Sequence, residues 1–155
     1  MKKSLCLFLC IYSFIPALAF GCFAPKPEQV VAPEILVKKA ESIYLGEAIG
    51  ASAKGIVDFK VVETLKGKKK NKIHIEAMLG TLKDTDFNKH EQVEFWQPSG
   101  GRMQIEPSCD INPHFEKGKK YLLVMGKPYH VKSFELILDK NDKWLKEVKG
   151  YLQAK

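Results

Sequence analysis

The chain has 155 residues and a formal net charge of +7 at neutral pH, from 25 lysines and arginines against 18 aspartates and glutamates. This length suffices for one hydrophobic core and predicts one domain rather than several. The positive surplus is compatible with acidic proteins, glycans or anionic membranes, and it is too diffuse to identify one of them.

Residues 1–21 have the pattern of a secretory signal peptide. Two lysines precede an apolar run, residues 4–15, which is too short to span a bilayer as a stable helix and ends before Pro16. Small residues then allow a peptidase to cut after Ala19 or after Gly21. An uncleaved N-terminal membrane anchor is the alternative. Cleavage after Gly21 leaves 134 residues and lowers the formal charge to +5, because two lysines leave with the leader.

Two cysteines, Cys22 and Cys109, follow this leader. In an exported chain they most simply form one disulfide. It would close a loop of 88 residues, counting both ends, and contribute about 4–5 kcal/mol in the chain-entropy model. One alternative is two free thiols in a reducing compartment. Another is a lipoprotein, because Gly21 precedes Cys22 as in a lipobox; the bulky Phe20 fits that motif poorly, and lipidation would leave Cys109 unpaired.

A proline-rich stretch, residues 25–34, follows shortly after Cys22 and predicts an extended arm. Pro33 can begin a short helix, because its fixed φ suits the first helical position. The inner side of this helix is expected to carry Ile35, Leu36 and Ala40.

Strands are predicted over residues 42–51, 55–67 and 71–79 from their alternation of apolar and polar side chains. The second is the clearest, with Asp58, Lys60 and Thr64 on its polar face. The residues expected to face inward along the second and third strands are Val57, Phe59, Val61, Leu65, Ile73, Ile75, Ala77 and Leu79.

Residues 80–92 are polar and predict a long loop. Two shorter strands are plausible over residues 92–96 and 102–106. The continuous apolar run at 120–125 predicts a strand that is buried on both faces, and 133–138 predicts one more strand.

A closing helix is predicted beyond Asn141, which is a suitable N-cap. Its apolar residues recur at helical spacing: Trp144, Leu145, Val148, Tyr151 and Leu152. Together the elements predict an all-β fold with minor α, in which five or six strands with a helix at each end form a small closed barrel. Periodicity does not distinguish an OB-fold from other small barrels.

The segment "CDINPHFEKGKKYLLVMGK", residues 109–127, resembles the tissue inhibitors of metalloproteinases and related netrin-like modules. In that family the cysteine that begins this segment, here Cys109, forms a disulfide with the first residue of the mature protein. The residue that matches this first residue here is Cys22 in "CFAPKP". The stretches "AESIYLGEA" and "VVETLKGKK" are similar to the first strands of bacterial relatives. The resemblance covers most of residues 22–138 and implies a closed Greek-key OB-fold barrel of five to six strands.

This chain departs from the family at a second disulfide. Ala24 stands where the family has a second cysteine, and the strand that carries its usual partner reads "HVKSFELIL", without a cysteine. Both ends of that bridge are therefore missing together. The separate C-terminal subdomain of the animal inhibitors is also absent.

The resemblance implies an unusual chemistry for Cys22. In the family, the α-amino nitrogen and carbonyl oxygen of this first residue bind the catalytic zinc of a target metalloprotease, and the next side chain, here Phe23, enters the specificity pocket. Cys22 and Phe23 are called the wedge from here on. The disulfide from Cys22 to Cys109 would hold this wedge rigid. The amine must be free and mostly unprotonated in the complex, and an α-amino pKa of about 8 permits its deprotonation at neutral pH. A lipidated Cys22, or a chain beginning at Phe20, could not act in this way.

The sequence therefore predicts an exported, disulfide-stapled OB-fold binding domain that resembles metalloprotease inhibitors. One alternative is that the bridge only staples the arm to the barrel of a domain with another protein partner, since fold does not give function. Another is a lipid-anchored envelope module without inhibitory activity. The sequence offers no nucleophile with a base, no metal cluster and no cofactor loop, so we expect neither an enzyme nor a cofactor.

Other candidate sites are weaker. The "PSGGR" turn at 98–102 lacks the spacing and ending of a phosphate loop. The lysines of a predicted hairpin loop could bind an anionic glycan, although such a run of lysines is more often a solvated turn. Those lysines are Lys66, Lys68, Lys69, Lys70 and Lys72. The histidines lack metal-ligand spacing and are expected at the surface: His74, His90, His114 and His130. Aromatics that could stack on single-stranded nucleic acid are Phe59, Phe95, Trp96 and Tyr121, but export makes that partner improbable.

Overall fold

The computed structural model describes residues 25–53, 55–80, 90–101, 111 and 113–154. The predicted signal peptide, Cys22, Phe23, Cys109, the strand expected at 102–106 and most of the loop expected at 80–92 lie outside these residues. In the described ranges, no helix is long and apolar enough to cross a membrane.

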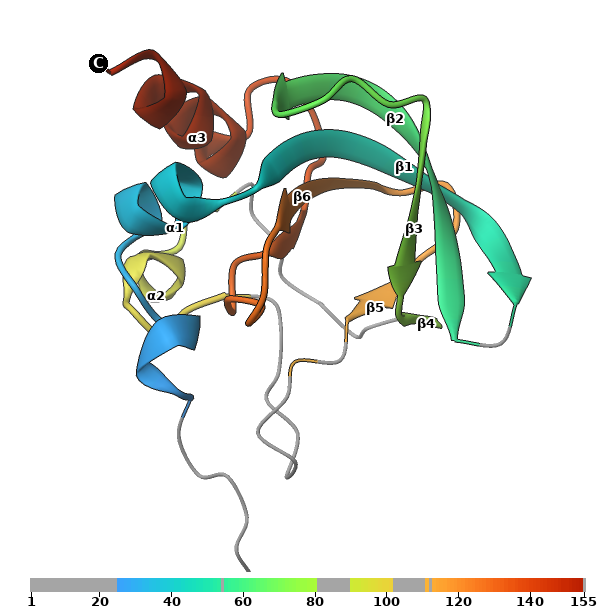
Figure 1. Ribbon diagram of the computed structural model, residues 1–155. Coiled ribbons are helices and arrows are strands. Elements are labelled where there is room, and N and C mark those ends of the chain that lie inside the picture. The colour runs from blue at the N-terminus through green and yellow to red at the C-terminus, as the bar shows by residue number, and fades with distance from the viewer. Residues whose placement is uncertain (1–24, 54, 81–89, 102–110, 112, 155) are drawn as a thin grey trace, which may run out of the picture.

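The main layer is an antiparallel sheet of five strands in the order β3-β2-β1-β6-β7 (Figure 1). A second, parallel pair joins β4 to β5. The strands are β1 (Ser42–Ala53), β2 (Ile56–Lys66), β3 (Lys72–Glu76), β4 (Met78–Leu79), β5 (His114–Phe115), β6 (Lys120–Met125) and β7 (Phe134–Leu136). The fold is thus mostly β, as the sequence predicts.

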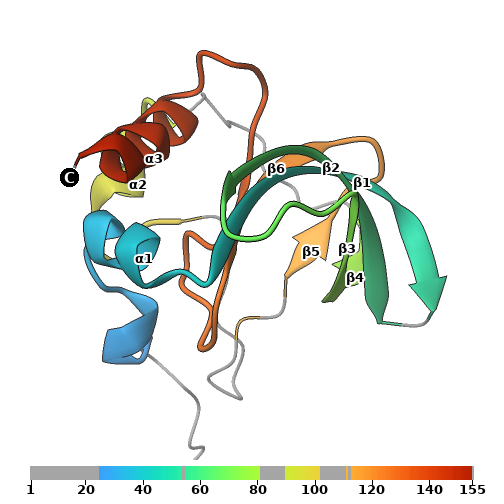
Figure 2. The ribbon, with the colours of Figure 1, turned by 45° about the horizontal axis from the view of Figure 1, so that its top comes forward.

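The helices gather at one end of this sheet, whereas β4, β5 and the turn between β1 and β2 lie at the other (Figures 1 and 2). They are a 3₁₀ turn η1 (Pro27–Gln29) and the helices α1 (Pro33–Lys39), α2 (Val93–Trp96) and α3 (Lys143–Gln153). The prediction of a helix before the first strand and another after the last strand is confirmed by α1 and α3.

Two hydrophobic clusters lie on opposite faces of β1 and β6. Tyr121 and Leu123 of β6 belong to a cluster inside the curved sheet, and Leu122 and Val124 belong to a cluster under the helices. All four are at most 1% exposed. The prediction that residues 120–125 form a strand buried on both faces is confirmed, because successive side chains of a strand point to opposite faces.

Residues 92–96 form the short helix α2 and not a strand, so that prediction is wrong. The rings of Phe95 and Trp96 lie 5.5 and 6.1 Å from the ring of Trp144. Neighbouring residues of a strand would point to opposite faces, whereas one helical turn brings both rings to the same tryptophan. Val93 is 70% exposed, so the apolar alternation that indicated a strand does not mark a buried face.

Three smaller expectations differ in detail. In α1 the fully buried side chain is Val37, and Ile35 is 43% exposed rather than inward. In the third predicted strand the inward pattern holds through Ala77 and fails at Leu79, which is 40% exposed. The reason is that β4 leaves the large sheet and pairs with β5. The N-cap of α3 is Asp142 and not the preceding asparagine.

Candidate functional site

The N-terminal arm is held to the body of the protein just after the predicted Cys22–Phe23 wedge. Gln29 is 2% exposed, and its side chain accepts a hydrogen bond of 2.9 Å from the backbone of Lys26. Its own carbonyl accepts a hydrogen bond of 3.0 Å from the backbone nitrogen of Val131. The first bond orders the arm locally, and the second attaches it to the turn that precedes β7.

His130 attaches the arm at a second point. Its Nε2 lies 2.9 Å from the carbonyl oxygen of Val31, and its Nδ1 accepts a hydrogen bond of 3.0 Å from the backbone nitrogen of Lys132. This pairing requires the neutral ring with its proton on Nε2. Burial lowers the pKa of His130 to about 4, partly opposed by the hydrogen bond to Val31, so the ring stays neutral at ordinary pH. Both nitrogens are therefore used within the fold.

One described residue from the segment after Cys22 and one from the segment after Cys109 pack against the same hydrophobic cluster. Val30, on the Cys22 side, packs against the cluster inside the sheet, and Ile111, two residues after Cys109, belongs to that cluster and is 7% exposed. Pro113 accepts a hydrogen bond of 3.0 Å from the backbone of Met78. Both segments thus contribute to one core cluster.

A buried network of charged side chains lies under the helices. Nδ1 of His90 lies 2.9 Å from both carboxylate oxygens of Asp142, and Nε2 lies 3.3 Å from Glu135. The three side chains are at most 1% exposed. Burial by itself would lower the pKa of His90, but the hydrogen bonds and charges of the two carboxylates outweigh it and raise that pKa.

Lys132 completes this network. It is fully buried, and its ammonium donates hydrogen bonds to the carbonyl oxygens of Gln97, Pro98 and Gly100. Burial lowers the pKa of Lys132 to about 8, and Glu135 opposes that shift. The ring of His90 and the ammonium of Lys132 thus each meet oxygen atoms, as buried polar groups require.

The network explains how residues 90–101 are attached. Nε1 of Trp96 donates a hydrogen bond of 2.9 Å to the carbonyl of His90, which has a left-handed φ of 63°. The turn at 98–101 directs carbonyl oxygens toward a cation. A phosphate loop would direct backbone amides toward an anion, so the prediction that this stretch is a turn and not a phosphate site agrees with its geometry.

The expectation that the histidines lie at the surface is wrong for two of them. His90 and His130 are 2% and 1% exposed. Residue spacing identified neither histidine, because His90 meets Asp142 and His130 meets Val31 across long stretches of the chain. His74 is at the surface, with Nδ1 2.7 Å from Asp58, and His114 is half-buried in β5. Within the described ranges, no group of three or more histidine, cysteine or carboxylate side chains could hold a metal.

The aromatic residues considered for nucleic-acid stacking mostly belong to the core. Phe59 and Tyr121 are fully buried, Phe95 is 8% exposed and Trp96 is half-buried. The first three therefore have no exposed face for a base.

No family model matches the chain, and no curated protein or solved structure is significantly similar to it. The likeness to netrin-like modules therefore stays a prediction that rests on the motifs in the sequence.

Proposed function

We propose that this protein is an exported, non-catalytic binding domain of the OB-fold type, and that its N-terminal arm inhibits a zinc metalloprotease. The observation that carries the proposal is the double attachment of the arm at Gln29 and Val31 to the turn at 130–131. A wedge that enters a protease must be held in one conformation, because ordering it on binding would reduce the affinity.

The strand pairing supports a barrel of the OB type. β1 pairs with β2 on one side and with β6 on the other, and β4, which continues β3, pairs in parallel with β5. Phe115 of β5 lies at the centre of the inner cluster. Its ring is 4.7 Å from Phe59 of β2, 4.9 Å from Tyr121 of β6 and 5.6 Å from Phe134 of β7. Strands from both sheets thus surround one core, as they do in a barrel.

The proposed chemistry belongs to the first two residues of the mature chain. The α-amino nitrogen and carbonyl oxygen of Cys22 chelate the zinc of the protease and displace the water that would attack a substrate. Phe23 fills the adjacent specificity pocket, and a disulfide from Cys22 to Cys109 limits the movement of the wedge. The zinc belongs to the protease, and the inhibitor needs no metal of its own.

The test compares the exported protein with a variant that carries one extra alanine before Cys22. The exported protein is first sequenced from its N-terminus and weighed intact. We expect it to inhibit at least one member of a panel of zinc metalloproteases stoichiometrically without being cleaved. The added alanine should abolish this inhibition, because it turns the chelating amine into an amide, a poor zinc ligand.

Phe23→Gly provides the matched control for the pocket. It keeps the amine and the disulfide, so it should change which proteases respond more than it changes the stability of the fold. Equal inhibition by the extended and the authentic chains would disprove chelation by Cys22. A diacylglyceryl group on Cys22, found by mass, would exclude the inhibitor mechanism and favour the lipid-anchored envelope module. A panel with no inhibited protease would favour a bridge that only staples the arm.

A further inference from the structure

Three segments that are distant in sequence bring exposed lysines together at one corner of the molecule, here called the basic corner. They are the end of α1 with the residues that follow it (38–42), the turn between β2 and β3 (66–70) and the loop after β6 (125–128). The exposed lysines of these segments are Lys38, Lys39, Lys68, Lys69, Lys70 and Lys127.

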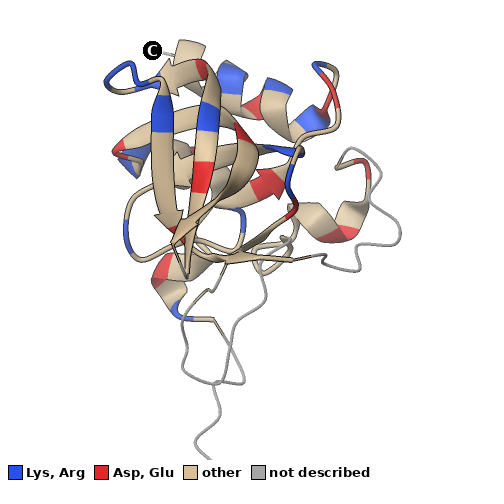
Figure 3. Cartoon of the chain, turned by 90° about the vertical axis from the view of Figure 1, so that its right-hand side faces the viewer, with Lys and Arg blue, Asp and Glu red and all other residues tan. Residues whose placement is uncertain are grey.

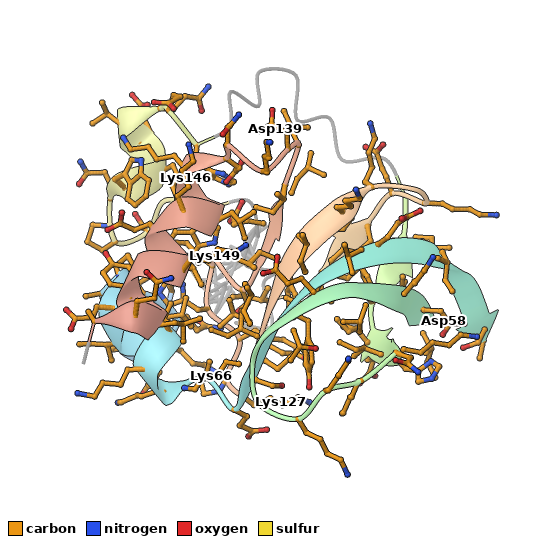
Figure 4. All side chains as sticks on the ribbon, turned by 90° about the horizontal axis from the view of Figure 1, so that it is seen from above. Asp58, Lys66, Lys127, Asp139, Lys146 and Lys149 are labelled. Atoms are coloured by element: carbon orange, nitrogen blue, oxygen red, sulfur yellow. The ribbon has the colours of Figure 1, made fainter. Side chains whose placement is uncertain are left out.

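Specific contacts hold the three segments together. Nζ of Lys66 donates hydrogen bonds of 3.0 and 2.8 Å to the carbonyl oxygens of Val37 and Lys38, which ties the turn to the end of α1. The backbone nitrogen of Glu41 donates 2.9 Å to the carbonyl of Met125, which ties the loop after β6 to the same place. Figure 4 shows Lys66 and Lys127 on this side of the molecule.

The turn itself has a fixed conformation. Gly67 has a left-handed φ of 87°, and a Cβ placed there would lie 2.7 Å from the Cβ of Ser42, so the two backbones are in close contact. The hydroxyl of Tyr44 donates 2.8 Å to the carbonyl of Lys68. The turn therefore presents its lysines from a preorganised backbone, which reduces the ordering needed on binding.

The charge of the basic corner is largely uncompensated. Glu41 is the one acidic residue in the three segments, against six exposed lysines. Among the described residues, no carboxylate forms an ion pair with any of those six, and the ammonium of Lys127 lies 5.8 Å from the ring centre of Tyr129. Lys66 and Lys72 contribute less, because the first is bound to helix carbonyls and the second lies near Asp58.

One part of the basic corner, the turn between β2 and β3, lies at the end of the molecule opposite η1. In Figures 1 and 3 the turn between β2 and β3 is at the top of the ribbon and η1 is in its lower part, and Figure 3 shows that turn in the colour of lysine. A ligand bound at this turn would therefore lie away from η1.

We propose that the basic corner is a second binding surface, and that its ligand is an anionic polysaccharide. Lysine is a strongly hydrated point charge that suits diffuse attraction to a charged polymer. A membrane surface is less suitable, because interfacial binding combines basic residues with exposed apolar ones, and the large exposed hydrophobics of the described chain lie outside the three segments. Single-stranded nucleic acid would need exposed aromatic faces. The export proposed above brings the protein into contact with such polysaccharides.

The test measures the affinity of the full exported protein for a heparin dodecasaccharide by calorimetry at two salt concentrations, about 50 and 150 mM. We expect salt-dependent binding. The variant Lys68→Ser/Lys69→Ser/Lys70→Ser should weaken it by at least about tenfold and flatten its salt dependence, because fewer counterions are released. Lys38→Ser/Lys39→Ser/Lys127→Ser should weaken it as well, since it removes the other lysines of the same surface.

The turn between β5 and β6 supplies a matched control. It also contains a glycine with a left-handed φ, Gly118 at 83°, and three exposed lysines, Lys117, Lys119 and Lys120. Changing these three to serine removes the same charge and should alter the affinity by less than about threefold. An equal loss in both triple variants, or no binding by the wild-type protein, would overturn the proposal. Equally tight binding to phosphatidylglycerol vesicles or to a DNA strand at the same salt would show that polysaccharide is not the preferred ligand.

Discussion

Replacing Asp142 tests whether the buried charged network stabilises the fold. Asp142 is fully buried and performs two tasks. Both of its oxygens lie 2.9 Å from Nδ1 of His90, and Oδ1 accepts a hydrogen bond of 3.1 Å from the backbone of Leu145, which caps α3. Asp142→Ala removes the cap and the counter-charge together, whereas Asp142→Asn keeps an oxygen for the cap and removes only the charge.

The expected loss in the free energy of unfolding follows from these contacts. An N-cap contributes about 1 kcal/mol, and breaking a buried ion pair costs about 3–5 kcal/mol because it leaves the partner charge uncompensated. Asp142→Ala should therefore lose about 4–6 kcal/mol, a large part of the roughly 5–15 kcal/mol of a typical domain. Asp142→Asn should lose less, about 1–3 kcal/mol, because the cap remains and His90 can become neutral.

The assay is urea unfolding followed by tryptophan fluorescence. Both tryptophans lie next to the network. Nε1 of Trp96 donates a hydrogen bond to the carbonyl oxygen of His90, and the ring of Trp144 is 6.1 Å from the ring of Trp96. Lys146→Ala, at an exposed position of α3, is the control and should change stability by no more than about 0.5 kcal/mol. A loss in Asp142→Ala as small as in this control would refute the reasoning.

Three further predictions concern stability. The exported protein should weigh about 2 Da less than its reduced form, from a Cys22–Cys109 bridge, and Cys109→Ser should lower its stability by up to about 4–5 kcal/mol; two alkylatable thiols without reductant would exclude the bridge. Trp144→Ala should lose about 3–5 kcal/mol, because the ring is fully buried. Trp144→Phe should lose less, since Nε1 has no partner in the described structure; a loss within about 0.5 kcal/mol for the alanine variant would show that α3 packs only loosely. Finally, because the pKa of His90 is raised in the fold, its stabilising contribution is complete below about pH 6.5 and is lost as pH rises through the raised value. As the pH rises from about 6.5 through the raised pKa of His90, the urea concentration at the unfolding midpoint should decrease for the wild type and stay constant for His90→Gln. Parallel curves of midpoint against pH for the two proteins would contradict the assignment.

Two other groups act on the same pH profile outside that window. The pKa of His130 falls to about 4 in the fold, so stability should decrease as pH falls from about 6.5, where the unfolded chain takes up a proton first. The pKa of Lys132 falls to about 8, so stability should increase between about pH 8 and 10.5, where the unfolded chain retains the proton longer. The effect of His90 is therefore measured between these two ranges.

The sequence alone determined the strands β1, β2 and β6 and the closing helix, because their apolar residues recur at the period of the element itself. Tyr121, Leu122, Leu123 and Val124 are buried on whichever face they point to, so a local pattern predicts their strand without knowledge of the partner strands. Trp144 likewise identifies the inner side of α3 from helical spacing alone.

Only the tertiary structure decided where the charged and aromatic side chains of the loops lie. In a sequence, Lys132, Glu135 and Asp142 indicate surface positions, because an isolated charge is rarely buried. Their burial is tolerable only because each meets a partner from a distant segment, as Asp142 meets His90 across 52 positions of the chain. The same holds for α2, whose Phe95 ring lies 5.5 Å from the ring of Trp144 in the distant helix α3. No local period records such long-range pairs, which form only when the whole core assembles.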